Sequence, residues 1–163
     1  MESMQMPSFT HTLLDEACTQ RLGEILGQML QPGMLIALNG PLGAGKSTLS
    51  RALIRSWGIT GTIKSPSYSW VESYSVPLGT LNHFDFYRFR DIEDWEAYGF
   101  DSYFDQHAIA LIEWPEKVAT LLPPVDLTLQ LDYHDSGRQV TAHSFTSAGN
   151  VCLTHLTNTL KTP

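Results

Sequence analysis

Residues 40–47 read Gly-Pro-Leu-Gly-Ala-Gly-Lys-Ser and match the phosphate-binding loop pattern G-x-x-x-x-G-K-[ST]. The apolar run Met34–Leu38 comes just before them and predicts a buried parallel strand. The stretch Ser47–Trp57 comes just after them and predicts a helix. This strand–loop–helix order is the context that the motif requires, so the sequence predicts a loop that binds nucleotide phosphates. A glycine-rich turn that contains Lys-Ser by chance is the alternative, with odds below roughly one in a hundred for a chain of this length.

Each residue type in this loop has a physical role toward phosphate. Glycines let successive backbone N–H groups turn toward phosphate oxygens, and the positive end of the following helix also favours an anion. We expect Lys46 to reach the β- and γ-phosphates and the Ser47 hydroxyl to hold Mg²⁺. The loop residues expected to contact the nucleotide are Gly40, Leu42, Gly43, Ala44, Gly45, Lys46, Ser47 and Thr48.

The length and composition are typical of one globular domain. The chain has 163 residues, 42% of them hydrophobic, and we expect a single domain over residues 1–163. No stretch approaches the ~18 consecutive apolar residues of a membrane helix, and residues 1–7 lack the features of a signal peptide. These absences predict a cytoplasmic protein, in which Cys18 and Cys152 stay as free thiols.

The charge of the chain argues against direct binding of nucleic acid. The formal net charge is −7 with only ten Lys and Arg residues, and the densest basic feature is Arg88-Phe89-Arg90. Binding to a phosphate backbone requires clustered basic side chains. We therefore expect no DNA contact, and we expect any RNA to be held by a partner protein.

Strand and helix patterns alternate along most of the chain. Beyond the phosphate loop, they predict strands near residues 7–13, 69–74, 80–87, 108–112, 125–133 and 138–145. They predict helices from residue 15 up to residues 32–33, in short pieces over 92–107, over 115–119 and over 147–160. This order predicts an α/β fold, a P-loop NTPase-like three-layer sandwich whose mostly parallel sheet gains antiparallel strands near the C-terminus.

Two acidic residues are candidates for the chemistry. Glu113 ends the apolar strand Ile109–Ile112, where P-loop proteins carry an acid that acts on Mg²⁺ or on its bound water. A helix-capping or surface glutamate is the alternative, and the phosphate loop upstream makes it the weaker one. Asp85 lies between two phenylalanines in a predicted strand, where aspartate is disfavoured. From the residues alone, a role in orienting water and a structural carboxylate paired with Arg88 or a backbone amide are equally good interpretations.

Other polar and aromatic residues indicate a role less clearly. Ser65-Pro66-Ser67 occupies the place of a nucleotide-sensing loop, but an ordinary proline turn is the better local interpretation. His83 and His107 have no nearby His or Cys partner in the sequence, so we prefer packing or surface roles over metal binding. Trp114 directly follows Glu113, a position that can bring its ring near the nucleotide.

Four motifs follow one another along the chain. They are the phosphate loop, Lys64-Ser-Pro-Ser-Tyr68, His83-Phe-Asp-Phe-Tyr-Arg88 and Leu111-Ile-Glu-Trp-Pro115. Their order and spacing resemble the TsaE family (also called YjeE), small bacterial ATPases of tRNA threonylcarbamoyladenosine synthesis. Many families share the phosphate loop, whereas its combination with the last two motifs is far more specific. The likeness extends over nearly the whole chain.

The resemblance implies an ATPase with ATP or ADP and Mg²⁺ as its ligands. It implies that Lys46 binds phosphate and that Ser47 and Glu113 are magnesium ligands. It also implies that Asp85 is a second acid of the active site, acting with Glu113 on the metal and the attacking water.

The resemblance also bears on a loop, an aromatic residue and the partners. It makes Ser65–Ser67 a switch-like segment and Trp114 a nucleotide-site residue, and it implies TsaD and TsaB as partners whose assembly meets tRNA. This chain departs from the family in having Pro41 where Asp is usual, and Ser47 and Ser67 where Thr is usual. Serine keeps the hydroxyl, whereas Pro41 removes a carboxylate and one N–H from the loop.

We therefore expect a Mg²⁺-dependent ATPase that acts as an accessory subunit of this tRNA modification machinery and hydrolyses ATP in complex with TsaB–TsaD. No arginine is an obvious arginine finger for the transferred phosphoryl group, and Arg88 is the one candidate. This lack predicts slow turnover by the chain alone and stimulation by partners. A small-molecule kinase is one alternative, although the chain has no Arg-rich insertion to close over a transferred phosphoryl group. A nucleotide-dependent switch without steady turnover is another, and the absence of an N/T-K-x-D motif argues against GTP as its ligand.

Overall fold

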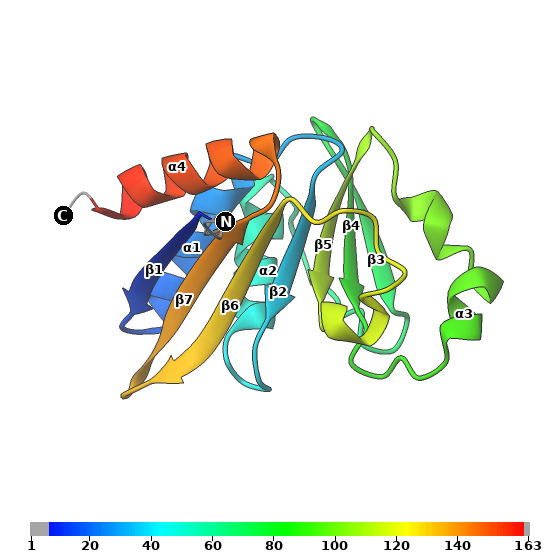
Figure 1. Cartoon of the computed structure of the whole chain (residues 1–163), viewed down its shortest axis with the longest axis horizontal. Helices are drawn as coiled ribbons and strands as arrows, with labels where there is room; N and C mark the ends of the chain where they lie inside the picture. The colour runs from blue at the N-terminus through cyan, green and yellow to red at the C-terminus, as the bar shows by residue number, and fades with distance from the viewer. Residues whose placement is uncertain (1–6, 162–163) are drawn as a thin grey trace, which may run out of the picture.

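The computed structural model describes residues 7–161 and contains a seven-stranded sheet with helices packed against it (Figure 1). The strand order is β1-β7-β6-β2-β5-β4-β3. The strands are β1 (Ser8–Leu13), β2 (Leu35–Asn39), β3 (Val71–Val76), β4 (Gly79–Asp85), β5 (Ala108–Glu113), β6 (Leu127–His134) and β7 (Gly137–Ser144). The helices are α1 (Glu16–Gly27), α2 (Lys46–Ser56), α3 (Ile92–Ala97) and α4 (Ser147–Lys161), with short 3-10 helices η1 (Phe100–Tyr103) and η2 (Pro115–Val118). The fold is therefore a mixed α/β sheet, as predicted.

The centre of the sheet is parallel, as the apolar strands predicted. β2 pairs in parallel with β5 on one side and with β6 on the other, and β5 pairs in parallel with β4. Every residue of β5 is buried, because helical segments cover both faces of the sheet there. The carboxyl ends of β2, β4 and β5 meet at one edge, the lower edge in Figure 1, where the loop from β2 to α2 also lies.

The outer strands are antiparallel. β6 and β7 form the hairpin that was predicted near the C-terminus, and β1 pairs with β7 while β3 pairs with β4. β3 begins two residues later than predicted, because the N–H of Trp70 closes a turn onto the carbonyl of Pro66 (N···O 2.6 Å). β4 ends at Asp85, earlier than predicted, because the chain then turns and the N–H of Phe89 bonds the carbonyl of Phe86 (3.0 Å).

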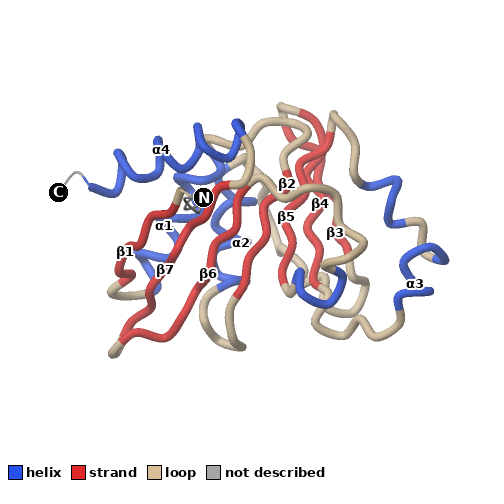
Figure 2. The backbone as a smooth tube through the Cα atoms, in the orientation of Figure 1, coloured by secondary structure: helices blue, strands red, loops and turns tan. Residues whose placement is uncertain are grey.

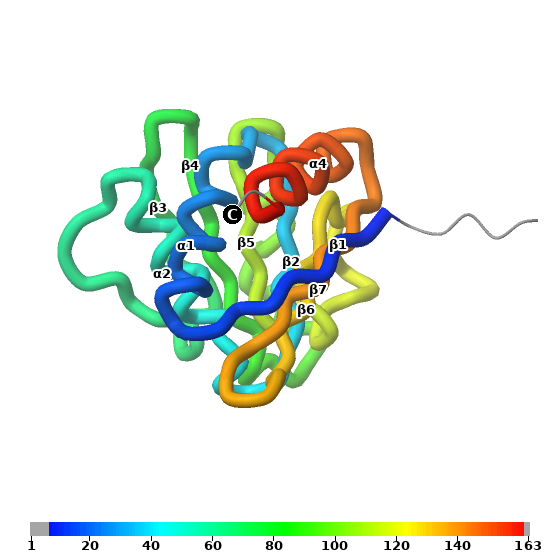
Figure 3. The backbone as a smooth tube through the Cα atoms, turned by 90° about the vertical axis from the view of Figure 1, so that its left-hand side faces the viewer, coloured from blue at the N-terminus to red at the C-terminus, as the bar shows by residue number. Residues whose placement is uncertain are grey.

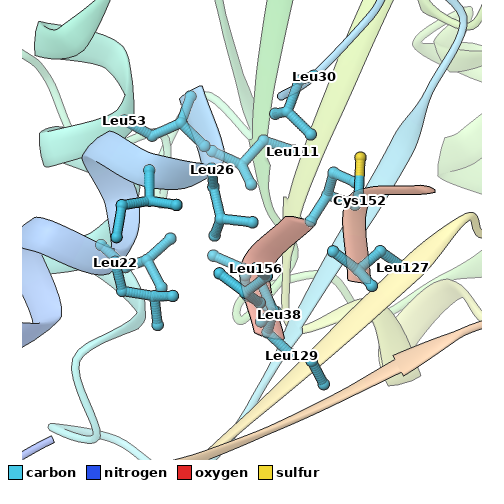
Figure 4. Packing of buried hydrophobic residues seen from close by; sticks show 14 of the residues in the cluster. Leu22, Leu26, Leu30, Leu38, Leu53, Leu111, Leu127, Leu129, Cys152 and Leu156 are labelled. Carbon is cyan, nitrogen blue, oxygen red and sulfur yellow. The ribbon is translucent and has the colours of Figure 1, made fainter. Parts of the chain in front are cut away.

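Three helices, α1, α2 and α4, cover one face of the sheet. α1 begins after Asp15, whose carboxylate caps it by accepting a hydrogen bond from the N–H of Cys18 (3.0 Å). Figure 3 shows α1 next to α2, and the apolar stripes of both helices face the strands, as their periodicity predicted. Figure 4 shows the leucines that join these layers: Leu22, Leu26, Leu53 and Leu156 from the helices, and Leu38, Leu111, Leu127 and Leu129 from the strands.

The third layer of the predicted sandwich is shorter than expected. On the second face, α3, η1 and η2 cover only the part of the sheet around β4 and β5, and Figure 2 shows α3 at the β3 end. Their core is aromatic, with Trp95 and Phe100 packed on Phe84 and Phe86. Alternate residues of β6 are only half-buried, because the helices described over residues 7–161 leave this face of β6 uncovered.

None of the helices over residues 7–161 is long and apolar enough to cross a membrane. Cys18 and Cys152 are free thiols, as predicted. The predicted domain over residues 1–163 and the interpretation of residues 1–7 stay predictions, because residues 1–6 and 162–163 lie outside the described part of the chain.

Candidate functional site

The phosphate loop leads from the carboxyl end of β2 into the first turn of α2. Gly45, at the N-cap of α2, has a φ of 110° and makes no side-chain capping bond, and the N–H of Leu49 bonds its carbonyl (2.9 Å). Gly40 has a φ of 146°, and a Cβ there would overlap the carbonyl oxygen of Leu131. These positions therefore need glycine, and the N–H groups in the first turn of α2 remain available to an anion.

The ammonium group of Lys46 lies against neutral partners. The residue is 5% exposed, and its Nζ donates to the carbonyls of Gly40 and Pro41, the latter at 3.0 Å. Nζ also lies 4.0 Å from the centroid of the Trp114 ring, which is a cation–π contact. Burial lowers the pKa of Lys46, while the charge of Glu113 opposes that shift. A buried cation with neutral partners is well placed to attract an anion.

Glu113 is buried at the carboxyl end of β5 and contacts three polar side chains. Its Oε1 accepts a hydrogen bond from the Oγ of Ser47 (3.0 Å), and its Oε2 accepts one from the Oγ of Ser50 (3.3 Å). Oε2 also lies 2.6 Å from Nε2 of His83 on the neighbouring strand β4. Burial alone raises the pKa of Glu113, but the hydrogen bonds of His83 and Ser47 and the nearby positive charge leave that pKa lowered. Glu113 is therefore an ionised carboxylate joined directly to the serine of the phosphate loop.

Asp85 lies beside Glu113, because β4 and β5 pair with these two residues in register. It is 6% exposed, and its Oδ1 accepts a hydrogen bond from the backbone N–H of Tyr87 (2.9 Å). Burial raises the pKa of Asp85, and the negative charge of Glu113 adds to the rise. A structural carboxylate at this position was expected to pair with Arg88 or with a backbone amide. The bond from the backbone amide of Tyr87 is present, whereas no ion pair with Arg88 occurs among the described residues.

A cleft of about 360 Å³ brings most of the predicted site residues together. Of the predicted loop residues, Gly40 and Ala44 are not among those that line it. The segment Ser65–Ser67 contributes Ser67 to the wall. The residues around the cleft are Leu42, Gly43, Gly45, Lys46, Ser47, Thr48, Ser67, Asp85, Tyr87, Arg88, Glu113 and Trp114.

Aromatic and basic side chains contribute to the wall of this cleft. Trp114 has a left-handed backbone with a φ of 59°, and its ring centroid lies 4.9 Å from that of Tyr87. Arg88 donates from Nη2 to the hydroxyl of Tyr68 (3.3 Å), and its guanidinium lies 4.5 Å from the centroid of the Tyr68 ring. Arg88, the candidate arginine finger, thus lines the cleft and packs on the exposed Tyr68, the last residue of the Lys64–Tyr68 motif.

The β6–β7 hairpin holds the phosphate loop from outside this cleft, a contact that the sequence did not indicate. The hydroxyl of Tyr133 donates to the carbonyl of Leu42, and Nη2 of Arg138 donates to the carbonyl of Gly43 (3.0 Å). The guanidinium of Arg138 also lies 4.5 Å from the Tyr133 ring centroid. The bonded pairs are 91 and 95 residues apart, so no local pattern in the sequence marks them.

His83 is a further site residue that the sequence did not identify. The prediction was a packing or surface role, and the residue is indeed buried at 2% exposure, but its ring contacts the carboxylate of Glu113. One signal was available, since the alternation of residues 80–87 puts His83 on the same face of its strand as Asp85.

Comparison with known proteins agrees with the motifs. The model of a family described as "Threonylcarbamoyl adenosine biosynthesis protein TsaE" matches residues 13–140. A tRNA threonylcarbamoyladenosine biosynthesis protein TsaE of Haemophilus influenzae is 35% identical over 158 residues, which cover 94% of this chain and 100% of that protein. A protein of the same name from Bacillus subtilis is 31% identical over 133 residues, which cover 81% of each chain. The crystal structure of YdiB from Bacillus subtilis shares the fold, with a TM-score of 0.81 and a sequence identity of 22%. The match covers 96% of this chain and 99% of that one.

Proposed function

Because the chain belongs to the TsaE family, we propose that it is a Mg²⁺-dependent P-loop ATPase that serves the biosynthesis of threonylcarbamoyladenosine in tRNA. The observation that carries the proposal is the hydrogen bond between Ser47 in the phosphate loop and Glu113 at the end of β5 (3.0 Å). A glycine-rich turn that contained Lys-Ser by chance would have no reason to meet a buried carboxylate of the central sheet.

The residues present fit ATP and Mg²⁺. The free N–H groups at the start of α2 and the ammonium of Lys46 suit phosphate oxygens. Mg²⁺ is typically held by one or two carboxylates together with substrate phosphates, and Glu113 with the Ser47 hydroxyl is such a donor set. Among residues 7–161, no group of three or more His, Cys, Asp or Glu is arranged to hold a metal without such phosphates.

The proposed catalysis consists of placement and charge neutralisation, because phosphoryl transfer to water needs little covalent chemistry from the protein. Lys46 and the loop N–H groups hold the β- and γ-phosphate oxygens, and Ser47 and Glu113 hold Mg²⁺. When bound, Mg²⁺ neutralises the charge on those phosphates. Asp85 orients the attacking water, since its carboxylate lines the cleft and its raised pKa makes it the more basic of the two acids.

We further propose that the chain works with TsaD and TsaB, and that their assembly binds the tRNA. Membership of the family supports this, as does the net charge of −7, which disfavours tRNA binding by the chain alone. Arg88 is the one arginine among the described residues that line the cleft, and it rests on Tyr68. Slow turnover by the chain alone and a higher rate in the complex follow from this shortage of positive charge.

The test is ATP hydrolysis by the purified chain with and without a TsaB–TsaD complex. We expect the complex to raise the rate at least ~10-fold, and Lys46→Ala or Glu113→Ala to lower it ~100-fold or more. Lys117→Ala is the matched control, because Lys117 is exposed and does not line the cleft. The proposal would be overturned if the hydrolysis rate were the same with and without the complex and were unchanged in Glu113→Ala. The chain would then be a nucleotide-binding fold without the proposed activity.

A further inference from the structure

His83 is a buried titratable residue to which the proposed mechanism gives no task. It lies on β4, two residues before Asp85, and its Nε2 is 2.6 Å from Oε2 of Glu113. Its other ring nitrogen, Nδ1, is buried and has no hydrogen-bond partner among the described residues. A histidine that uses one nitrogen on a carboxylate and leaves the other unused costs more free energy to bury than an apolar side chain would. The contact with Glu113 is therefore the feature of His83 that needs a reason.

The contacts of Glu113 are divided between its two oxygens. Oε1 contacts Ser47 of the phosphate loop, whereas Oε2 contacts His83 on β4 and Ser50 on α2. The last torsion of a glutamate side chain has a broad range, so an unsupported carboxylate rotates and presents either oxygen. Because an ionised carboxylate only accepts hydrogen bonds, the ring of His83 donates to it through a proton on Nε2.

We propose that His83 is a positioning residue for magnesium binding: its Nε2–H holds Oε2 of Glu113, so that Oε1 stays beside the Ser47 hydroxyl and faces the metal. This inference rests on the proposed function and deepens it. Side chains that orient a metal ligand typically account for ~10–100-fold in metal affinity when they are lost. His83 would thus act through Glu113 without touching nucleotide, metal or water.

Two substitutions separate positioning from packing. His83→Leu fills the buried volume but donates no hydrogen bond. His83→Gln places an amide N–H near the position of Nε2 and can restore the donor. Asn82→Ala is the matched control for damage to β4, because Asn82 is equally buried but bonds Ser73 and Tyr103 instead of Glu113.

The experiment measures the dissociation constant of ADP by titration calorimetry with and without Mg²⁺, together with thermal unfolding of each variant. We expect His83→Leu to bind ADP without Mg²⁺ within ~2-fold of the unmodified chain, and to lose ~10-fold or more of the gain in affinity that Mg²⁺ provides. We expect His83→Gln to recover most of that gain, and Asn82→Ala to keep it in full despite a lower melting temperature.

Three other outcomes overturn the proposal. If His83→Leu keeps the full Mg²⁺-dependent gain, His83 does not position the metal ligand, while the proposed function stands. If His83→Gln and His83→Leu lose the gain equally, hydrogen-bond donation is not the cause. If the unmodified chain shows no Mg²⁺-dependent gain at all, the proposed function fails and this inference fails with it.

Discussion

Four nearly buried ionisable side chains share one end of the sheet: Lys46, His83, Asp85 and Glu113. Their environments move the pKa values of the two acids in opposite directions, with Asp85 raised by burial and Glu113 lowered by its hydrogen bonds. Two acids whose pKa values are pushed apart in this way commonly divide the work of a site between them. The acid with the lower pKa is the better ligand for a metal cation, and the acid with the higher pKa is the better base to accept a proton from water.

The raised pKa of Asp85 predicts a conflict between stability and activity at this residue. At neutral pH, Asp85→Asn removes a buried negative charge and keeps an acceptor for the N–H of Tyr87, so we expect the free energy of unfolding to rise by about 1 kcal/mol. We expect ATP hydrolysis to fall ~100-fold or more, because the amide cannot take a proton from water.

The stability gain from Asp85→Asn should also depend on pH. Because the folded-state pKa lies above the unfolded value of about 3.9, the folded chain binds more protons between these two values, and stability falls as pH rises through that window. The gain is therefore complete above the folded pKa and disappears below about pH 3.9. Urea unfolding at several pH values measures it, with exposed Asp91→Asn as the control, and an equal or lower stability of Asp85→Asn at pH 7 would contradict the assignment.

Among the elements, α2 carries the residues that the proposed function assigns to phosphate, and it packs closely against α1. Gly23 allows the close approach, because a Cβ there would lie 2.5 Å from the carbonyl oxygen of Leu49 in α2. One turn further along α1, a Cβ on Gly27 would overlap the hydroxyl of Ser56, the movable end of a side chain, and would lie at an ordinary contact distance of 3.4 Å from the carbonyl oxygen of Leu53 and from the Cβ of Ser56. The overlap at Gly23 is with a backbone atom of Leu49, so no rotamer change can relieve it.

This difference predicts unequal effects of two glycine substitutions on the same helix face. We expect Gly23→Ala to destabilise the fold by about 1–3 kcal/mol and to weaken ADP binding, because α2 must move away from α1. We expect Gly27→Ala to cost less than about 1 kcal/mol, because Ser56 can rotate and alanine favours the helix. Urea unfolding and ADP titration of both variants provide the measurement, and equal losses would show that the contact with Leu49 does not set the position of α2.

At the scale of the whole molecule, the site depends on parts of the chain that meet only in the folded sheet. The hairpin β6–β7 reaches the phosphate loop with Tyr133 and Arg138, which hold the carbonyls of Leu42 and Gly43. Fixing these carbonyls holds two peptides of the loop. The N–H of Gly43 shares a peptide with the Leu42 carbonyl and is one that the proposed function directs at phosphate, whereas the N–H of Ala44 shares a peptide with the Gly43 carbonyl and closes the loop onto the carbonyl of Pro41 (3.2 Å).

We therefore expect Arg138→Ala to weaken ADP binding while leaving the fold intact. A hydrogen bond from a charged side chain at a partly exposed place contributes about 1 kcal/mol, which corresponds to roughly fivefold in the dissociation constant. Calorimetric titration of ADP tests this, and Arg51→Ala on the exposed surface of α2 serves as the control. An unchanged affinity in Arg138→Ala would mean that the loop keeps its shape without the hairpin.

By itself, the sequence determined the features that depend on neighbours along the chain. The phosphate loop, the apolar strand ending in Glu113, the parallel centre of the sheet and the terminal hairpin all follow from local patterns of glycine, apolar runs and turns. Strand ends were less accurate at β3 and β4, because backbone turns near Trp70 and Phe86 interrupt a continuous β pattern.

The tertiary structure alone decided the contacts that depend on strand order and register. His83 meets Glu113 because β4 lies next to β5, and Arg138 meets Gly43 because the hairpin projects past the end of β2. The partial third layer also depends on which strands α3, η1 and η2 reach. Periodicity gives the face of a strand on which a residue lies. The partner of that residue on the next strand depends on which strand order and register bury the apolar faces of the whole sheet. The residues that meet in the two contacts above are 30 and 95 positions apart in the sequence.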